Sequence, residues 1–300
     1  MSQDNISLAV LGTSEGNGHP YSWSAIINGY NSDKLNLCPY PIIRNYLSDV
    51  VRDSNDFKNV QITHIWTQDE KESENIANFA NIKNISKDYK NIINEVDGIL
   101  LARDDFENHQ ELSYRFLEAG LPVYIDKPIA VKKIDLSKIF NHQCYNGQIF
   151  SCSALKNANE FKLSDDDLTA YGRIMTIKAS APNDWLHYAV HIIDPVIKLF
   201  KLNGEYNLIN KFSEIDGSHT ANFKWNNDIT VEFETTGSNT PLFIEIIGDK
   251  KKNKIEFKDT YSAFKNTLEL FIDNIRYKNN PTTREELEIA VGIIEKGYYG

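Results

Sequence analysis

Residues 96–128 decide the fold, and their sequence reads VDGILLARDDFENHQELSYRFLEAGLPVYIDKP. The apolar run from Gly98 to Ala102 predicts a buried strand, and a helical stretch follows from Glu107 to Ala119, where Gly120 ends it. A second short strand, Pro122 to Ile125, comes directly after that glycine. A strand, a helix and a strand joined by short connections indicate a right-handed crossover within one parallel sheet.

The same alternation precedes this stretch in the chain. Two apolar runs and two amphipathic stretches predict the strands Ile6 to Leu11 and Val60 to Trp66 and the helices Ser22 to Asn28 and Asp69 to Asn81. Residues 29–59 form an insertion that is too long for a simple connection and contains a predicted helix from Ile42 to Val51. Insertions of this length are often lids. The first half of the chain therefore predicts an α/β fold with a parallel sheet covered on both faces.

The pattern changes after Pro128. One more helix is expected from Ile134 to His142, and the strand-like runs that follow are joined by turns such as residues 226–228. These runs are Ile149 to Leu155, Arg173 to Ala179, Tyr206 to Phe212, Thr220 to Trp225, Ile229 to Glu234 and Leu242 to Ile247. Helices are predicted at His187 to Leu202, Tyr261 to Tyr277 and Thr283 to Gly297, the last opened by a Thr-Glu capping box. This half predicts a mostly antiparallel sheet with helices.

The composition is that of an ordinary globular protein. The chain has 32 lysines and arginines against 42 aspartates and glutamates, a formal net charge of −10 at pH 7. This charge has the wrong sign for binding along a phosphate backbone, so nucleic acid is not an expected partner. The apolar runs are shorter than the about 20 residues that cross a bilayer, so no membrane segment is expected. Three cysteines (Cys38, Cys144 and Cys152), an odd number without metal-ligand spacing, indicate a reducing cytoplasm and no metal site.

A glycine-rich turn follows the first strand, where residues 11–20 read LGTSEGNGHP. Such a turn lets backbone N–H groups and a helix N-terminus approach a pyrophosphate. The candidate cofactor contacts here are Gly12, Thr13, Ser14 and Gly16. Ser14 stands at the second glycine position of a GxGxxG pattern, and Glu15 adds a negative charge. A bare tight turn is the alternative interpretation.

Thr67 and Gln68 occupy the end of the second strand. A dinucleotide-binding domain usually places an acid there that binds the adenosine ribose of NAD. Neither residue is a carboxylate or a cation, and no arginine lies beside them in the sequence to bind a 2′-phosphate. The choice between NAD and NADP therefore stays open, and helix N-capping by Thr67 or Asp69 is the alternative role.

The segment 96–128 resembles the Gfo/Idh/MocA oxidoreductase family: a strand, an Asn-His pair opening a helix, an Ala-Gly helix stop, a short strand and then a Glu-Lys-Pro motif. This chain has Asp126-Lys127-Pro128 at the motif. In the family the lysine of the motif touches both nicotinamide and substrate, which makes Lys127 the first residue to carry over. The resemblance also makes candidate cofactor contacts of Ala102, Arg103, His109 and Asp126.

A second family landmark matches residues 184–194, DWLHYAVHIID. His191 and Asp194 fit its His-x-x-Asp portion, and His187 stands where the family has aspartate. Histidines at i and i+4 project from one helix face, so the two rings could share a pocket. Three interpretations stay open: a proton relay through His191, a zinc pair, and structural packing. Lys156 lies where family members carry a basic residue facing the substrate, and an exposed lysine at a strand end is its alternative.

The resemblance implies a Rossmann domain of residues 1–128, with the insertion 29–59, and an α+β domain of residues 129–300 whose open sheet mediates homo-oligomers. It implies an NAD(P)(H)-dependent oxidoreductase that transfers a hydride between nicotinamide and a secondary alcohol or ketone of a sugar, cyclitol or sugar-derived compound. Lys127 would polarise the substrate oxygen and His191 would handle the proton, with His187, Lys156 and Asp194 beside the substrate. The alternative is a dinucleotide-binding regulator or sensor with the same fold and no turnover.

Overall fold

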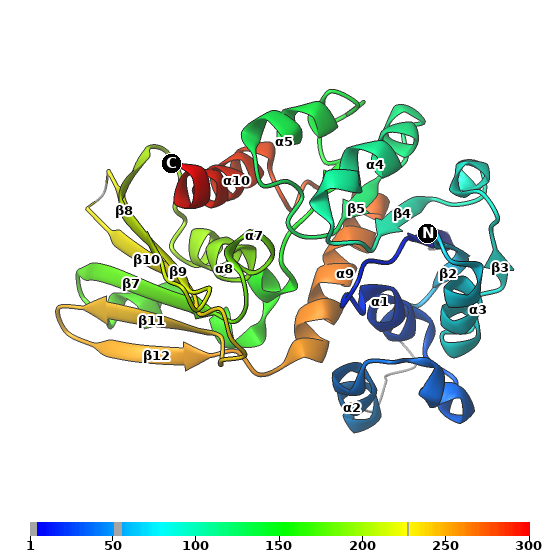
Figure 1. The fold of residues 1–300 in the computed structure, drawn as a ribbon, viewed down its shortest axis with the longest axis horizontal. Coiled ribbons are helices and arrows are strands. Elements are labelled where there is room, and N and C mark those ends of the chain that lie inside the picture. The colour runs from blue at the N-terminus through cyan, green and yellow to red at the C-terminus, as the bar shows by residue number, and fades with distance from the viewer. Residues whose placement is uncertain (1–4, 51–55, 227) are drawn as a thin grey trace. The chain divides into compact units, whose positions relative to one another are not determined.

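The structure is a computed structural model that describes residues 5–50, 56–226 and 228–300, and its chain separates into two units (Figure 1). The first unit takes the chain up to Asp126, together with Ser137–Ser151 and Thr267–Thr282. The second unit takes Lys127–Leu136, Cys152–Asn266 and Thr283–Gly300. Each unit contains one six-stranded sheet.

The sheet of the first unit has the strand order β3-β2-β1-β4-β5-β6. Its strands are β1 (Ile6–Leu11), β2 (Val60–Trp66), β3 (Asn84–Ile85), β4 (Gly98–Leu101), β5 (Val123–Ile125) and β6 (Ile149–Phe150). Every neighbouring pair is parallel. The chain order reverses between β1 and β4, so the carboxyl ends of these two strands form the switch point at which doubly wound sheets bind ligands. The predicted α/β fold with a parallel sheet is confirmed.

Helices follow the strands of this sheet as predicted, with small changes at their ends. They are α1 (His19–Asn28), α2 (Pro41–Asp49), α3 (Glu70–Phe79), α4 (His109–Glu118) and α5 (Lys133–Phe140), with the short 3₁₀ helices η1 (Ser32–Leu37), η2 (Tyr89–Ile92) and η3 (Phe106–Asn108). The insertion thus contributes η1 and α2. The predicted end of its helix, Val51, lies outside the described residues.

The insertion packs on the glycine-rich turn. A Cβ added at Gly18 would lie 2.4 Å from Ile43 Cδ1, and the Tyr40 hydroxyl donates to the carbonyl oxygen of Asn17 at 3.1 Å. Glycine at position 18 therefore permits close packing of α2 against the start of α1.

The predicted strand Ile149 to Leu155 is wrong in two respects. Only Ile149 and Phe150 of this run form a strand, and they pair with β5 in the parallel sheet of the first unit. The chain then turns into η4 (Ala154–Asn157), because the Ser153 hydroxyl accepts the N–H of Leu155 and caps that turn. An apolar run does not distinguish a strand from a buried turn of this kind.

The sheet of the second unit is mixed, with the order β12-β11-β7-β10-β9-β8. Its strands are β7 (Ile174–Ala181), β8 (Tyr206–Ser213), β9 (His219–Trp225), β10 (Thr230–Thr235), β11 (Phe243–Gly248) and β12 (Lys252–Glu256). Only the pair β7 and β10 is parallel, so the prediction of a mostly antiparallel sheet is confirmed. The turn between β9 and β10 includes residue 227, which is outside the described part of the chain.

The helices of the second unit include one correction. They are η5 (Asn159–Phe161), α6 (Asp165–Thr169), α7 (Trp185–Tyr188), α8 (Val190–Leu199), α9 (Thr260–Tyr277), which continues into the first unit, and α10 (Arg284–Tyr299). The single helix predicted from His187 to Leu202 is two helices, α7 and α8, separated at Ala189. The predicted capping box is formed by Thr283 and Glu286.

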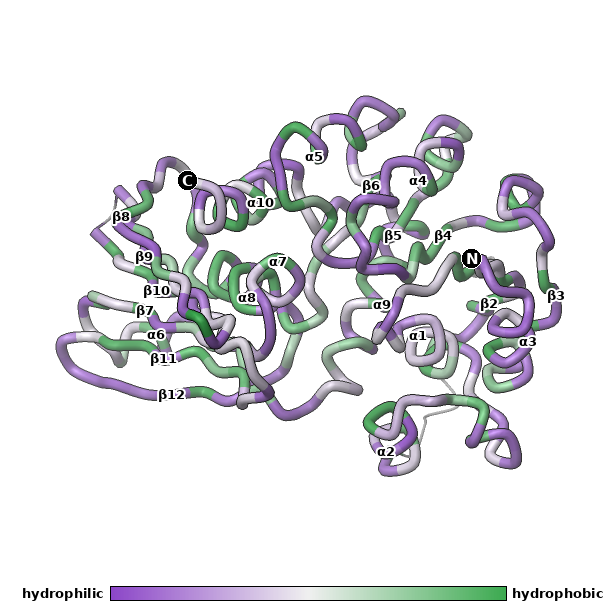
Figure 2. The backbone as a smooth tube through the Cα atoms, viewed as in Figure 1, coloured by the Kyte–Doolittle hydropathy of each residue, from purple (hydrophilic) through white to green (hydrophobic). Residues whose placement is uncertain are grey.

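The core of the second unit lies between its sheet and α7, α8 and α10, which contact the strands. Alternate residues of β9 (Ala221, Phe223 and Trp225) are buried, as are nearly all residues of α8. Figure 2 shows α8 as a hydrophobic helix. Within the described residues no helix has the length and apolar character needed to cross a membrane.

Candidate functional site

The glycine-rich turn begins where β1 ends. Gly12 has φ +79° and Gly16 has φ +77°, conformations that favour glycine. A Cβ at Gly12 would lie 2.3 Å from Arg103 Cδ, whereas no atom lies within 4 Å of a Cβ placed at Gly16. The Arg103 side chain, which follows β4, therefore lies directly over Gly12. The structure brings these two predicted cofactor residues together at the switch point of the sheet.

Ser14 joins the turn to the same loop. Its hydroxyl donates to Asp104 Oδ1 at 2.6 Å and accepts the Asp104 N–H at 3.2 Å. Arg103 pairs in turn with Asp105. Partial burial would raise the pKa of Asp105, but its hydrogen bonds from Arg103 and the charge of Arg103 lower it. The loop after β4 is thus fixed by hydrogen bonds at the edge where a cofactor would lie.

The turn offers a pyrophosphate group the open space beside Gly16. At the start of α1, the His19 N–H already donates to Asn17 Oδ1 at 2.8 Å, and Pro20 has no N–H. The positive end of a helix and exposed N–H groups are the usual anion donors in this fold. The carboxylates of Glu15 and Asp104 make the surroundings more negative than such a site usually is.

The side chains of the two residues after β2 point in different directions. Thr67 is 5% exposed, and its hydroxyl donates to the Asp69 carbonyl oxygen at 2.5 Å, so it faces the interior. Gln68 lies against the glycine-rich turn: its Oε1 accepts the Thr13 N–H at 3.2 Å and its Nε2 donates to the Thr13 carbonyl at 2.6 Å. The N-cap of α3 is Asp69, the second of the two predicted capping residues.

His109 and Ala102 are both fully buried. His109 Nε2 lies 2.7 Å from the carbonyl oxygen of Arg103, and the Ala102 N–H donates to the Leu11 carbonyl at 3.0 Å. Both residues therefore support the backbone of the loop that carries Arg103.

Asp126, at the end of β5, is the centre of a buried cluster. Its Oδ2 accepts Asn17 Nδ2 at 2.9 Å and lies 2.5 Å from His19 Nδ1. The His19 ring stacks on Trp23 with centroids 5.0 Å apart, and Trp23 stacks on Tyr124 at 4.6 Å. The carboxylate thus ties the start of α1 to the end of β5. Sequence reasoning missed Asn17, and for His19 the only signal was its position after the glycines.

Lys127, next to Asp126 in the chain, belongs to the second unit and is 5% exposed. Its Nζ lies 5.6 Å from the centroid of the Tyr188 ring, and the centroids of Tyr188 and His191 are 5.4 Å apart. Lys127 and His191 therefore contact the same aromatic ring. Sequence reasoning missed Tyr188, although it lies between the two histidines of residues 184–194.

Ser153 connects His191 with Asp194. Its Oγ lies 2.7 Å from His191 Nδ1, and its backbone N–H donates to Asp194 Oδ2 at 2.6 Å. Burial raises the pKa of Asp194 to about 6, although the nearby charge of Lys156 and the Ser153 N–H act in the opposite direction. Both residues of the His-x-x-Asp segment are thus held by one serine that sequence reasoning did not single out.

Lys156 lies in η4 and is 8% exposed, so the alternative of an exposed lysine at a strand end is wrong. Its Nζ lies 3.3 Å from Glu286 Oε2. Burial lowers the pKa of Lys156, but the negative charges around it, Asp194 and Glu286 among them, outweigh burial and raise it. Burial also raises the pKa of the neighbouring Cys152 thiol to about 12. This lysine is a buried cation beside Asp194.

His187 has a different partner from His191. Asp184, the N-cap of α7, accepts the His187 N–H at 3.1 Å and lies 2.9 Å from its Nδ1. Burial acts to raise the pKa of Asp184, but the hydrogen bonds from His187 lower it. The two histidines lie in α7 and α8, which meet at Ala189, a residue whose backbone keeps right-handed helical angles. In the described part of the chain, no group of three or more His, Cys, Asp or Glu residues could hold a metal ion.

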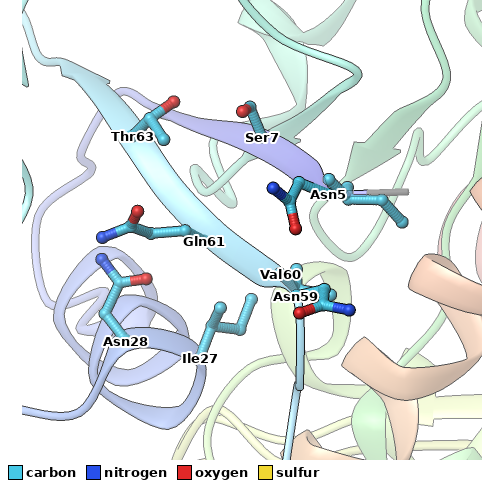
Figure 3. A pocket seen from close by; sticks show the side chains of 9 residues that line it. Asn5, Ser7, Ile27, Asn28, Asn59, Val60, Gln61 and Thr63 are labelled. Carbon is cyan, nitrogen blue, oxygen red and sulfur yellow. The ribbon is translucent and has the colours of Figure 1, made fainter. Parts of the chain in front are cut away.

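A cavity of about 410 Å³ lies elsewhere in the first unit (Figure 3). It is lined at the amino ends of β1 and β2 by Ser7, Gln61 and other polar residues, together with Asn28 of α1. The Asn28 amide is already bonded to the backbone of Ile62 and to the carbonyl of Ala80. Ligands of parallel α/β sheets bind at the carboxyl ends of the strands, so this cavity is separate from the candidate site.

Comparisons with known proteins agree with this geometry. The model of the oxidoreductase family with an NAD-binding Rossmann fold, Gfo/Idh/MocA, matches residues 43–152. A search of curated proteins finds no match. Among solved structures, myo-inositol 2-dehydrogenase from Lactobacillus plantarum is similar with a TM-score of 0.72 and 12% identity, over 97% of this chain and 96% of that one.

Two further similar structures were solved with cofactor. Scyllo-inositol dehydrogenase from Lactobacillus casei, with NAD(H) and scyllo-inositol, has a TM-score of 0.72 and 11% identity over 97% of this chain and 95% of its own. GenD2 from gentamicin A biosynthesis, in complex with NAD, has a TM-score of 0.74 and 10% identity over 99% of this chain and 94% of its own. At these identities the likeness shows the fold.

Proposed function

Since this chain belongs to the Gfo/Idh/MocA oxidoreductase family through its NAD-binding Rossmann domain, we propose that it is an NAD(P)-dependent dehydrogenase or reductase acting on CH–OH groups. Its substrate would be a secondary alcohol or ketone of a sugar, cyclitol or sugar-derived compound. The observation that carries the proposal is the contact of Lys127 and His191 with one ring, that of Tyr188. An ammonium and an imidazole at one aromatic ring are the two groups that carbonyl and alcohol chemistry needs.

The cofactor would lie along the carboxyl ends of β1, β4 and β5. The backbone of Gly12, Thr13, Ser14 and Gly16 would face the pyrophosphate, and Gln68 would face the adenosine ribose. Arg103 would contact the cofactor from the loop after β4. When bound, the nicotinamide supplies or accepts the hydride. Asp126, which the start of α1 fixes, would hold the backbone of the following lysine at the nicotinamide end.

Lys127 would polarise the substrate oxygen with its ammonium group, because a nearby positive charge stabilises negative charge that develops on that oxygen. His191 would exchange the proton with the same oxygen. The Tyr188 ring lies beside both groups, with Lys127 Nζ over the ring and His191 in an edge contact with it. Lys156 and Asp194 lie behind His191 and would fix its surroundings, and His187 would contact the substrate from α7.

Two of the similar solved structures are inositol dehydrogenases, which supports the proposed substrate class. Cyclitols and sugars carry secondary hydroxyl groups of the kind on which Lys127 and His191 would act.

We further propose that the open sheet of the second unit forms homo-oligomers, which size-exclusion chromatography with light scattering would test. A cytoplasmic location, expected from the odd number of cysteines, remains part of the proposal.

The proposal is tested by separating binding from turnover. Purified protein should quench the fluorescence of NADH or NADPH and should consume the reduced cofactor with members of a panel of keto-sugars and keto-inositols. Binding without consumption across the panel, and without reduction of NAD by the matching alcohols, would favour the non-catalytic regulator or sensor. Mass spectrometry of co-purified cofactor would decide between NAD and NADP.

A further inference from the structure

The Ser153 hydroxyl has two hydrogen-bond partners among the described residues. Its Oγ lies 3.2 Å from the backbone nitrogen of Leu155 and 2.7 Å from His191 Nδ1. Ser153 is fully buried, with an exposed fraction of 0%. Because water does not reach the Ser153 hydroxyl, its hydrogen must point to one of these two partners.

The chemistry of the two partners decides where that proton goes. The Leu155 nitrogen carries a hydrogen and can only donate, so Ser153 Oγ accepts from it. The remaining partner, His191 Nδ1, is the one acceptor within reach of the hydroxyl hydrogen. A buried hydroxyl that fails to donate is costly, so the Ser153 O–H donates to His191 Nδ1. A nitrogen that accepts this hydrogen bond carries no proton, and the ring hydrogen is then on Nε2.

We propose that Ser153 is a positioning residue that fixes His191 in the neutral tautomer with its proton on Nε2. The Asp194 carboxylate supports this arrangement by accepting the Ser153 backbone N–H, which fixes the serine itself.

The consequence for the reaction rests on the proposed function. A neutral His191 with hydrogen on Nε2 presents an N–H donor that can hydrogen-bond the carbonyl oxygen of a ketone. It cannot release this proton on its own, because the ring would become an imidazolate, so completing the reduction requires a second proton on the ring. Oxidation of an alcohol requires a bare nitrogen at the same position. The resting site is therefore arranged to bind and polarise the ketone.

The tautomer can be measured directly by NMR on the full-length protein labelled with ¹⁵N-histidine. The chain has seven histidines, and the His191→Gln variant identifies the signals of His191. Wild-type protein should show a pyridine-type Nδ1 and a pyrrole-type Nε2 for His191. Ser153→Ala should give a mixture of tautomers, and Ser153→Thr, which keeps the hydroxyl, should restore the wild-type pattern. The control is Ser151→Ala, which removes another buried serine hydroxyl of the same segment.

Two results would overturn the inference: a protonated Nδ1 in the wild type, or unchanged His191 signals in a folded Ser153→Ala protein. The first result needs no Ser153 variant, so it can contradict the inference even if Ser153→Ala misfolds. Ser153→Ala should also lower kcat for reduction about tenfold with little change in KM, and Ser153→Thr should recover most of it. Failure of the wild type to turn over any substrate would contradict the proposed function alone, since the NMR result does not depend on activity.

Discussion

Each of the two units contains a buried aspartate that holds a histidine, and the two aspartates do so in different ways. In the first unit, Asp126 contacts His19 Nδ1 directly at 2.5 Å. In the second unit, Ser153 stands between Asp194 and His191, with its backbone N–H on the carboxylate and its hydroxyl on the ring. A carboxylate requires a hydrogen on the imidazole nitrogen that it contacts, whereas a hydroxyl can donate to that nitrogen. We therefore expect His19 to donate from Nδ1 to its partner, whereas His191 accepts at Nδ1 and carries its proton on Nε2.

The difference shows why a histidine near an aspartate in sequence is an uncertain guide to mechanism. His19 lies 107 positions from its aspartate, and its contact with Asp126 fixes the start of α1. His191 is only three residues from Asp194, yet its ring reaches a serine from another segment. The chemical state of each ring follows from the atom it contacts and not from the spacing in the chain.

The largest effect is expected from Lys127→Ala. This change removes the ammonium that lies over the Tyr188 ring, which His191 also contacts. We expect kcat to fall about 1,000-fold, as for loss of a group that stabilises charge in the transition state, with NADH affinity changed less than about threefold. Steady-state kinetics and fluorescence titration measure the two quantities. The exposed Lys133→Ala is the matched control. Undiminished turnover in Lys127→Ala would remove Lys127 from the mechanism.

The second effect is on stability as a function of pH and concerns the buried Asp194. Burial raises its pKa to about 6 from the ordinary 3.8, so the folded protein binds more protons than the unfolded chain between these values. The free energy of unfolding should therefore fall by about 3 kcal/mol as the pH rises from about 4 through about 6. Urea unfolding at a series of pH values should show that Asp194→Asn loses this slope.

Asp184 provides the control of opposite sign for that experiment. Despite the opposing effect of burial, hydrogen bonds from His187 lower the pKa of Asp184, so its contribution to stability is present above the unfolded pKa and is lost as the pH falls through the folded pKa. Asp184→Asn should remove a contribution to the free energy of unfolding that rises with pH. If the free energy of unfolding of the two variants depended on pH with the same slope, Asp194 would not be the source of the fall between about pH 4 and about pH 6.

Breaking the direct contact between Asp126 and His19 should have a smaller effect than the changes at Lys127 and Asp194. Asp126→Asn leaves a buried amide opposite Asn17 and His19, and we expect a loss of about 2 kcal/mol in the free energy of unfolding. Asp97→Asn replaces an exposed carboxylate that accepts one backbone N–H, from Ser7 at 2.8 Å, and should cost less than about 1 kcal/mol. Similar losses in the two proteins would show that the buried cluster contributes no more than a surface contact.

The smallest effect concerns cofactor preference. Gln68, which lies against the glycine-rich turn, carries no charge. Gln68→Asp would place a carboxylate at this strand end, where it repels a 2′-phosphate, and should weaken NADPH binding about tenfold relative to NADH. The control Gln61→Asp adds the same charge near the opposite end of β2. A parallel change in both cofactor affinities would mean that Gln68 does not face the adenosine ribose.

The central strands of the first sheet were predicted well because apolar residues recur along them: β1 and β4 are almost fully buried, and β2 alternates buried with more exposed residues. Ile6 to Leu11 and Val60 to Trp66 were predicted to the residue. The strand β12 was missed because its residues, Lys252 to Glu256, are mostly exposed and polar, so no apolar pattern marks them. The run Ile149 to Leu155 was assigned to the wrong sheet because hydrophobicity reports burial and not the identity of the neighbouring strand.

The candidate site was predictable only where a motif fixed it. Lys127, His191 and Asp194 follow from the resemblance, but Ser153 and Tyr188 do not, because a serine in an apolar run and a tyrosine in a helix have many structural roles. Asn17 and His19 reach Asp126 across more than 100 positions. Such contacts depend on the folded arrangement of β5 and α1, and one sequence carries no signal for them.

The stacked rings of His19, Trp23 and Tyr124 give the first unit an optical reporter of its own. Trp23 is 1% exposed and lies almost parallel to both neighbours, at 13° and 16°. Indole emission is sensitive to an adjoining imidazole, and particularly to a charged one. A protein that keeps Trp23 and carries phenylalanine at the other three tryptophans would therefore report, by its emission intensity, when an anion arrives at the adjacent helix start.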